Sequence, residues 1–360
     1  MKANRLFFID AVRAFAIIMM LQGHFIDTLL AIEYRDEDHI VFQIWKYFRG
    51  ITAPTFFTIS GIIFTYLLMK SKKNATSNTR IKKGAVRGVM LISIGYALRA
   101  PVFEWAQGVF KDYFLIVDVL QCIGLSILLT ILIYMATFKK SAMFSIIMIS
   151  LGTTIFLCEP LYRSLDVSQL PLFIANYLTK TNGSVFTIIP WFGYMAYGAF
   201  IATLFYGFLE KAKFKTILVT SLLIIGALLI WYSSHFFNWI YLQSNILLFK
   251  EVAYYNYLFT RLGNVLILLG IFYYCEQYIK QSLILKIGQK TLSIYVIHFV
   301  IIYGSLTGVG LHQIIGKNLN PYQAGVGAII FVTTVCALSL YRIKTNQFIY
   351  TQLRKVIRRN

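Results

Sequence analysis

Long apolar runs, separated by short polar segments, recur along the whole 360-residue chain. Ten of these runs are about 18 to 26 residues long, close to the roughly 20 residues that an α-helix needs to cross a bilayer. The pattern therefore predicts an all-α, polytopic integral membrane protein of about ten transmembrane helices. The expected spans are Leu6–Ala31, Thr52–Met69, Gly84–Phe103, Ile116–Phe138, Ser141–Cys158, Ser184–Leu209, Thr216–Ser234, Leu258–Cys275, Thr291–Val309 and Tyr322–Tyr341.

The segments between these runs are too short to hold another domain. None exceeds about 30 residues, whereas a small domain needs about 50, so we expect one membrane-embedded domain over residues 1–360. The first run carries charged residues and lacks a small-residue cleavage site, so we expect it to stay as a span. The shorter aromatic stretch Phe236–Phe249 predicts an interfacial or re-entrant helix.

Composition supports the membrane assignment and narrows the possible partners. The chain is 58% hydrophobic and 13% charged, whereas soluble domains are about a quarter charged. Its formal charge of +20 would suit a nucleic-acid partner, but the cations lie beside the apolar runs, where they set topology. We expect the lipid bilayer, and no nucleic acid, as a partner. The four cysteines lie within apolar runs without metal or redox spacing, so no metal or tightly bound cofactor is expected.

The polar segments alternate in charge along the chain. Of the 34 Lys and Arg residues, 23 fall in one alternating set of segments, which includes both termini. The positive-inside rule then places both termini on the cytoplasmic side of the cell (inner) membrane. The acidic residues between Glu33 and Asp38 would face the outside.

The first span carries the most informative polar residues. Arg13 and His24 are eleven residues apart, which returns them to one helix face about 16 Å apart along the axis. Asp10 precedes Arg13 by three residues and Asp27 follows His24 by three, so each pair is within reach on a helix. Ionisable groups in a span are costly and mark functional sites. The spacing therefore predicts a functional role for His24 and Arg13, with Asp27 expected to orient the imidazole.

Further polar residues fall near the ends of later spans. Arg87 and Arg99 are separated by too few residues to cross a bilayer, so at least one of them must reach into the membrane region or line a wet cavity. Ion pairing within the helix bundle is the alternative to a functional role. A basic segment before the third span would bind an anionic cosubstrate with several phosphates, unless it serves lipid headgroups or topology alone. His298 is expected to be structural. The predicted substrate-binding residues are Arg80, Lys82, Lys83, Arg87, Arg99, Asp118, Arg261 and Asn264.

Several segments resemble a known family. FIDAVRAFAIIMMLQGHF is similar to the opening helix of transmembrane acyltransferases, in which an arginine, ten residues and a histidine follow one another. The ordered set TAPTFFTISGIIFTYL, VDVLQCIGLSILL, TIIPWFGYMAYGAF and IGQKTLSIYVIHF resembles the branch of heparan-α-glucosaminide N-acetyltransferase catalytic domains and their bacterial YeiB-like relatives. The sibling acyltransferase family three shares the Arg–His spacing, and Ala14 stands where the family often has glycine.

The resemblance implies a membrane acyltransferase. Such an enzyme takes an acyl group, usually acetyl, from cytoplasmic acyl-CoA and passes it to a hydroxyl or amine of a glycan or another cell-envelope acceptor. It implies that His24 is the catalytic base or a transient acyl carrier and that Arg13 is essential. Acyl-CoA would be a cosubstrate, not a tightly bound cofactor. The sequence does not name the acceptor or the oligomeric state.

A transporter or flippase is the alternative reading. Charged groups and a helix interrupted at Pro190–Trp191 suit the transport of a small anion, a lipid-linked sugar or a proton-coupled solute equally well. Such proteins often contain paired repeats with matching interruptions, and none is visible in this sequence.

Overall fold

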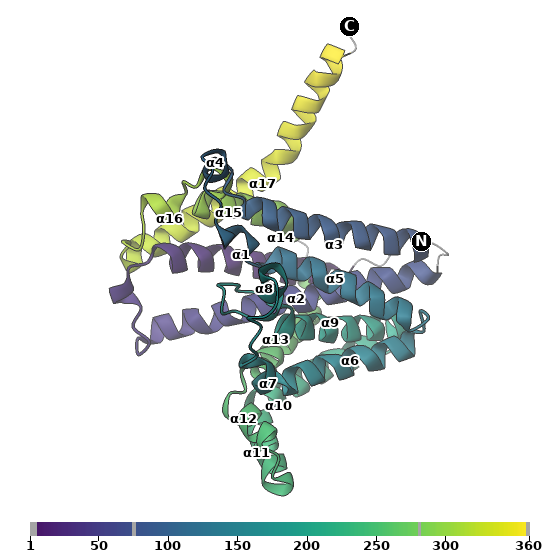
Figure 1. Ribbon diagram of the computed structural model, residues 1–360. Helices are drawn as coiled ribbons and strands as arrows, with labels where there is room; N and C mark the ends of the chain where they lie inside the picture. The colour runs from purple at the N-terminus through teal and green to yellow at the C-terminus, as the bar shows by residue number, and fades with distance from the viewer. Residues whose placement is uncertain (1–5, 74–76, 280–281, 358–360) are drawn as a thin grey trace. The chain divides into compact units, whose positions relative to one another are not determined.

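The computed structural model describes residues 6–73, 77–279 and 282–357, and all their regular secondary structure is helical apart from one isolated bridge (Figure 1). The longer helices are α1 (Phe7–Leu29), α2 (Ile40–Lys73), α3 (Ser77–Arg99), α5 (Val119–Ala136), α6 (Ser141–Leu157), α9 (Ile188–Phe208), α10 (Phe214–Trp231), α13 (Tyr257–Tyr274), α15 (Thr291–Tyr303) and α17 (Pro321–Ile357). The shorter ones are α4 (Val102–Ala106), α7 (Glu159–Arg163), α8 (Leu172–Leu178), α11 (Ser233–Ser244), α12 (Leu247–Tyr254), α14 (Ser282–Gln289) and α16 (Leu311–Ile314). Single 3-10 turns are η1 (Ile32–Tyr34), η2 (Asp112–Leu115), η3 (Cys275–Tyr278) and η4 (Ser305–Thr307).

Every expected span coincides with one of these helices, and the all-α, polytopic membrane architecture is confirmed. Within the described residues, seven helices are long and apolar enough to cross a membrane, or eight if the bent pair α14 and α15 forms one span. The two other expected spans are α6, which has 17 residues, and α3, which carries several cations along its length. The total of ten spans and the cytoplasmic termini stay predictions.

Several boundaries differ from those expected. Helix α2 begins at Ile40, not Thr52, so Arg49 lies inside it. Helix α15 ends at Tyr303, where Gly304 adopts a left-handed conformation that closes the helix. Ahead of α15, α14 is bent away by 70° at Lys290. The expected short helix around Phe236–Phe249 is a pair of helices, α11 and α12.

The chain divides into two compact units, which we describe separately. One comprises residues 1–52, 101–103 and 279–360, and the other residues 53–100 and 104–278. The boundary between residues 52 and 53 falls inside α2. The single domain expected over residues 1–360 stays a prediction.

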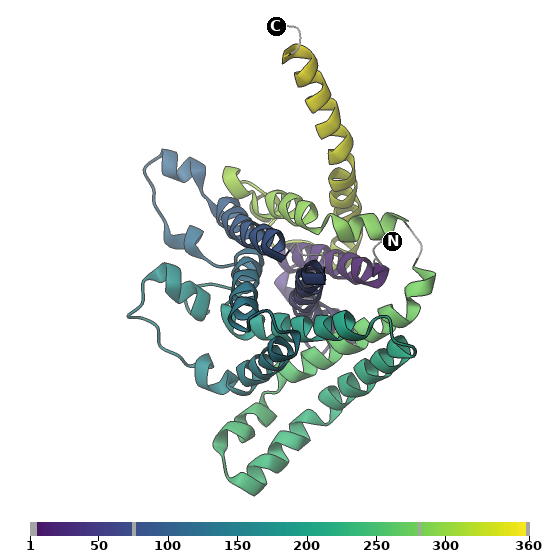
Figure 2. The same cartoon turned by 90° about the vertical axis from the view of Figure 1, so that its right-hand side faces the viewer.

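In the first unit, α1 packs against α14, α15 and α17. Gly288 of α14 lies so close to the start of α1 that a Cβ atom there would come within 1.9 Å of the Asp10 carbonyl oxygen. At the other end of α1, Leu30 forms the isolated bridge with Leu319, just before α17. These contacts fix both ends of the helix that carries Arg13 and His24. Helix α17 continues as one long helix toward the C-terminus (yellow in Figure 2).

In the second unit, neighbouring helices form the pairs α3–α5, α6–α9 and α10–α13. Helix α9 also meets α2 through small residues, because a Cβ atom at Gly198 would lie 2.0 Å from the Thr58 carbonyl oxygen. Such close backbone contacts are typical of helices packed within membranes. Helices α11 and α12 pack as a hairpin after α10. Helix α9 is interrupted at Ile189, next to the predicted break at Pro190–Trp191.

Candidate active site

Helices α1 and α15 pack side by side and share two polar contacts. Near the start of both helices, Arg13 Nη2 donates a 2.6 Å hydrogen bond to Thr291 Oγ1. Near their ends, His24 Nδ1 lies 2.8 Å from Tyr303 Oη. The two helices therefore run in the same direction. The eleven-residue step from Arg13 to His24 and the twelve-residue step from Thr291 to Tyr303 cover similar lengths, about 16 and 18 Å.

Arg13 is held at the junction of α1, α14 and α15. Its Nη1 atom lies 3.8 Å from Asp10 Oδ1, which confirms the predicted pair of neighbours. Thr291 is the first residue after the bend between α14 and α15. Arg13 thus joins α1 to that bend, while Gly288 allows the close approach described above.

His24 is half-buried near the end of α1 and is oriented by Tyr303. Tyr303 is the last residue of α15, which fixes the position of its hydroxyl group. A neutral imidazole has one donor and one acceptor nitrogen. With Nδ1 in contact with the tyrosine, a base at this position would use its other ring nitrogen, Nε2, on a substrate.

A second histidine lies beside the first. His298 of α15 is completely buried, and its ring centroid is 5.2 Å from that of His24. The sequence interpretation of His298 as a structural residue does not anticipate this contact. Within the described residues, no group of three or more His, Cys, Asp or Glu side chains is arranged to hold a metal ion.

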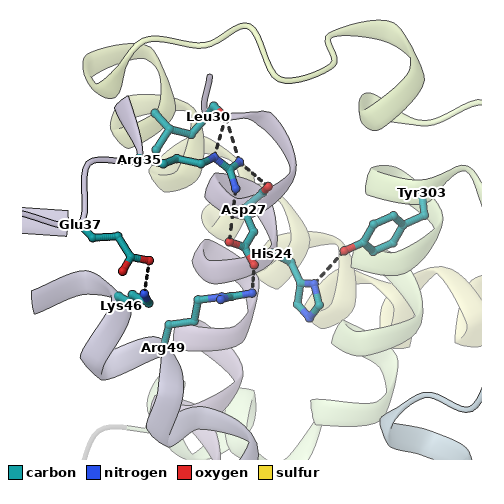
Figure 3. A network of polar contacts seen from close by, with 8 residues as sticks. All are labelled: His24, Asp27, Leu30, Arg35, Glu37, Lys46, Arg49 and Tyr303. Atoms are coloured by element: carbon teal, nitrogen blue, oxygen red, sulfur yellow. Dashed lines mark hydrogen bonds and ion pairs between the residues drawn. The ribbon is translucent and has the colours of Figure 1, made fainter. Parts of the chain in front are cut away.

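Asp27 faces a pair of arginines (Figure 3). Its carboxylate forms an ion pair with Arg49 of α2, and Arg35 Nη1 lies 4.0 Å from Oδ1. Arg35 also donates to the carbonyl oxygens of Asp27 and Leu30, at 2.6 and 2.9 Å. These donors satisfy carbonyl groups that the end of α1 leaves without helical partners.

The structure therefore gives Asp27 and His24 different contacts from the pairing expected on the helix surface. Figure 3 shows the Asp27 carboxylate directed toward Arg49, while the His24 ring is directed toward Tyr303. Two cations attract the carboxylate more strongly than a neutral imidazole does. The catalytic roles predicted for His24, Asp27 and Arg13 stay predictions. The sequence alone did not identify Tyr303 or Thr291, although both lie in or just after the segment IGQKTLSIYVIHF.

Replacing Tyr303 by phenylalanine should lower turnover by up to about tenfold, because a hydrogen bond of this kind contributes about 1 kcal/mol. The ring would remain while the contact that orients His24 Nδ1 would be lost. Acetyl-transfer kinetics of the purified protein, as proposed below, provide the measurement. Tyr322→Phe is the matched control, because Tyr322 is 80% exposed on α17 of the same unit. Equal turnover of Tyr303→Phe and wild type would contradict an orienting role.

In the second unit, Arg99 and Asp118 form the most enclosed of the ion pairs found among the described residues. Arg99 Nη2 donates a 2.9 Å hydrogen bond to Asp118 Oδ1, and Nε contacts Oδ2. The two side chains are 10% and 12% exposed. Asp118 is the residue before α5, whereas the expected span Ile116–Phe138 included it. Arg99 also lies over the Tyr113 ring at 4.7 Å. The structure thus joins two of the predicted substrate-binding residues in one ion pair.

Arg261 and Asn264 lie on α13 of the same unit. The Arg261 guanidinium lies 5.2 Å from the centre of the Tyr257 ring, and Asn264 Nδ2 donates to the Thr260 carbonyl at 3.0 Å. Lys180, in the loop before α9, lies near Arg261. Loss of hydration lowers the pKa of Lys180, and the positive charge of Arg261 lowers it further. Lys180 and Arg261 thus lie close together, with the Glu159 carboxylate also near Lys180.

The four cations expected to bind phosphates lie on the first half of α3, also in the second unit. Lys82, Lys83 and Arg87 are exposed, and Arg80 is half-buried. Burial lowers the pKa of Arg80, and Arg87 lowers it further by charge repulsion. The structure thus brings Arg80 and Arg87 near each other, as an anion-binding surface requires.

The family model for "Heparan-alpha-glucosaminide N-acetyltransferase, catalytic" matches residues 5–244. The chain belongs to this family. The match covers two thirds of the 360 residues and includes Arg13, His24 and Asp27. Helix α15, with His298 and Tyr303, lies beyond the matched range. No curated protein sequence gives a significant match to the chain.

Membership of the heparan-alpha-glucosaminide N-acetyltransferase catalytic family confirms the predicted resemblance and implies a membrane acetyltransferase in general. Together with the apolar helices, it supports a multi-pass membrane protein.

Proposed function

We propose that the protein transfers an acetyl group from cytoplasmic acetyl-CoA to a hydroxyl or amine of a glycan or other cell-envelope acceptor in the cell (inner) membrane. The observation that carries the proposal is the position of His24 within the matched family range, with Nδ1 held by Tyr303. An imidazole fixed in this way presents its other nitrogen in a defined direction, as a general base requires.

The reaction balances with His24 as the base. Nε2 takes the proton from the acceptor hydroxyl or amine while the acceptor oxygen or nitrogen forms a bond to the thioester carbonyl carbon. The carbon–sulfur bond then breaks, its electron pair stays on sulfur, and the histidine returns the proton to give CoA–SH. In the second route, Nε2 of His24 attacks the thioester carbonyl carbon, and the carbon–sulfur bond breaks to release the CoA thiolate. The acceptor oxygen or nitrogen then attacks the acetyl group on Nε2, the carbon–nitrogen bond to the histidine breaks, and the acceptor's proton is taken up by the thiolate.

The remaining polar residues divide into donor-binding and positioning groups. We assign the cations Arg80, Lys82, Lys83 and Arg87 to the phosphates of acyl-CoA, because such groups form charge-assisted hydrogen bonds to phosphate oxygens. We assign Asp27 to holding Arg35 and Arg49 at the end of α1, and Arg13 to fixing the α14–α15 bend. Arg261 and Asn264 are proposed to contact the acceptor.

Membranes containing the protein should transfer radiolabelled acetyl from acetyl-CoA to an envelope fraction, and membranes without it should not. Label in lipid-linked or polymeric carbohydrate would support the proposal. The competing transporter or flippase function predicts movement of a lipid-linked sugar or a small anion across vesicles without any acyl-CoA. Such movement together with an absence of acetyl transfer would overturn the enzyme proposal.

A further inference from the structure

His298 occupies an environment that packing alone does not explain. Its side chain is 0% exposed, and neither ring nitrogen has a hydrogen-bond partner of normal geometry among the described residues, although the backbone carbonyl groups of Ile294 and Tyr295, one turn earlier on α15, lie near the ring. The rings in contact with it belong to His24, Tyr295 and Phe299. A buried polar group without a partner costs about 1–3 kcal/mol. An apolar side chain of similar size would fill the same space without that penalty.

The position of His298 on α15 connects it to the proposed chemistry. Its ring centroid lies 5.2 Å from that of His24, and the rings are tilted by 46°. Tyr303, five residues later on the same helix, holds His24 Nδ1. Helix α15 thus places two polar side chains beside His24. One is Tyr303, whose hydroxyl group contacts Nδ1, and the other is the buried imidazole of His298. A buried, unpartnered imidazole beside a candidate base is suited to bind a polar atom of a ligand.

We propose that His298 is a second catalytic residue, which donates one N–H hydrogen bond to the carbonyl oxygen of the acyl donor. The inference rests on the acetyl-transfer function proposed above. As the acceptor attacks the carbonyl carbon, the carbonyl π electrons move onto oxygen, and the His298 N–H stabilises the resulting oxyanion. When the carbon–sulfur bond breaks, the carbonyl re-forms and His298 is unchanged. His24 alone carries the proton from the acceptor to the sulfur atom.

The burial of His298 favours this division of roles. A neutral imidazole has one N–H donor, which is what an oxyanion requires. While His24 carries the proton, a second positive charge on the neighbouring ring would be repelled and would lose its hydration. A donor fixed in a dry site also stabilises an oxyanion more effectively than a donor in water.

Three substitutions test the donor role. His298→Leu removes the donor, whereas His298→Asn and His298→Gln keep an amide N–H near the positions of Nδ1 and Nε2 respectively, without the ability to take up a proton. We expect His298→Leu to lower kcat about 10²–10³-fold, with little change in the KM for acetyl-CoA. Either Asn or Gln should recover at least about a tenth of wild-type kcat, and the better of the two identifies the donating nitrogen.

The controls separate this inference from the function on which it rests. His312→Gln changes an exposed histidine of the same unit and should match wild type. Thermal unfolding of each purified variant in detergent establishes that it is folded, and kinetic comparisons use the folded variants. If wild type transfers acetyl but His298→Leu does so equally well, the His298 proposal fails alone. It also fails if Asn and Gln are both as inactive as Leu, since proton uptake would then be the property required. Absence of transfer by wild type overturns the proposed function itself.

Discussion

The His24→Ala variant should transfer acetyl about 10²–10⁴-fold more slowly than wild type, the range by which a positioned general base accelerates a reaction. The imidazole is half-buried, is held at Nδ1 by Tyr303 and lies beside His298. Alanine removes the group that would accept the acceptor's proton and leaves those neighbours in place. The loss should therefore appear in kcat, with little change in the KM for acetyl-CoA.

The same variant distinguishes the two proposed routes. If His24 carries the acetyl group, wild-type protein mixed with labelled acetyl-CoA and no acceptor should retain label after rapid acid-free denaturation, and His24→Ala should not. If His24 acts only as a base, neither protein should retain label. The second result, with slow transfer by the variant, would support the base and exclude a stable acyl-histidine.

His312→Ala is the matched control, because this exposed histidine of α16 belongs to the same unit and lies outside the proposed site. It should transfer acetyl at the wild-type rate. If His24→Ala did so as well, the mechanism would be wrong. The membrane architecture would be unaffected, because it depends on the apolar helices and not on His24.

The membrane helices and the polar residues of α1 could be predicted from the sequence, whereas the residues that contact Arg13 and His24 could not. Hydrophobic runs and the spacing of Arg13 and His24 are local properties, so they can be read directly. The partners Thr291 and Tyr303 lie almost 280 residues away. Only the packing of α15 along α1 brings them close, and a single sequence contains no signal for that register.

Asp27 illustrates the limit of helical spacing as a guide. It lies three positions after His24, and that spacing permits contact on a helix. The cations that it binds, Arg35 and Arg49, come from the turn after α1 and from α2, whose early start at Ile40 the hydropathy pattern did not predict. Where several charged groups are available, tertiary packing decides which of them pair. The contacts of the site residues therefore had to be determined from the structure, even where the helices that carry them could be predicted from the sequence.

Removing the Asp118 carboxylate should destabilise the protein by about 3–5 kcal/mol, because Arg99 would lose the carboxylate of a largely buried ion pair. The two side chains are only 10% and 12% exposed, so water and salt screen the pair weakly. The Asp118→Ala variant should unfold at a clearly lower temperature in detergent than wild type. Glu104→Ala is the control, because Glu104 and Lys111 form a 3.1 Å pair in the same unit but are 42% and 60% exposed. It should lose less than about 1 kcal/mol.

The double variant Arg99→Met, Asp118→Leu decides whether this pair serves stability or chemistry. Apolar residues of similar volume often replace a buried ion pair without loss of stability, so the double variant should unfold close to the wild-type temperature. Because the Asp118 carboxylate already binds Arg99, and the Tyr113 ring lies beneath its guanidinium, we expect the double variant to keep most of its acetyl-transfer activity. Full stability with lost transfer would instead assign Arg99 to the reaction, as an oxyanion-stabilising cation. An additive loss of stability in the double variant would contradict the ion-pair argument, since coupled partners are not additive.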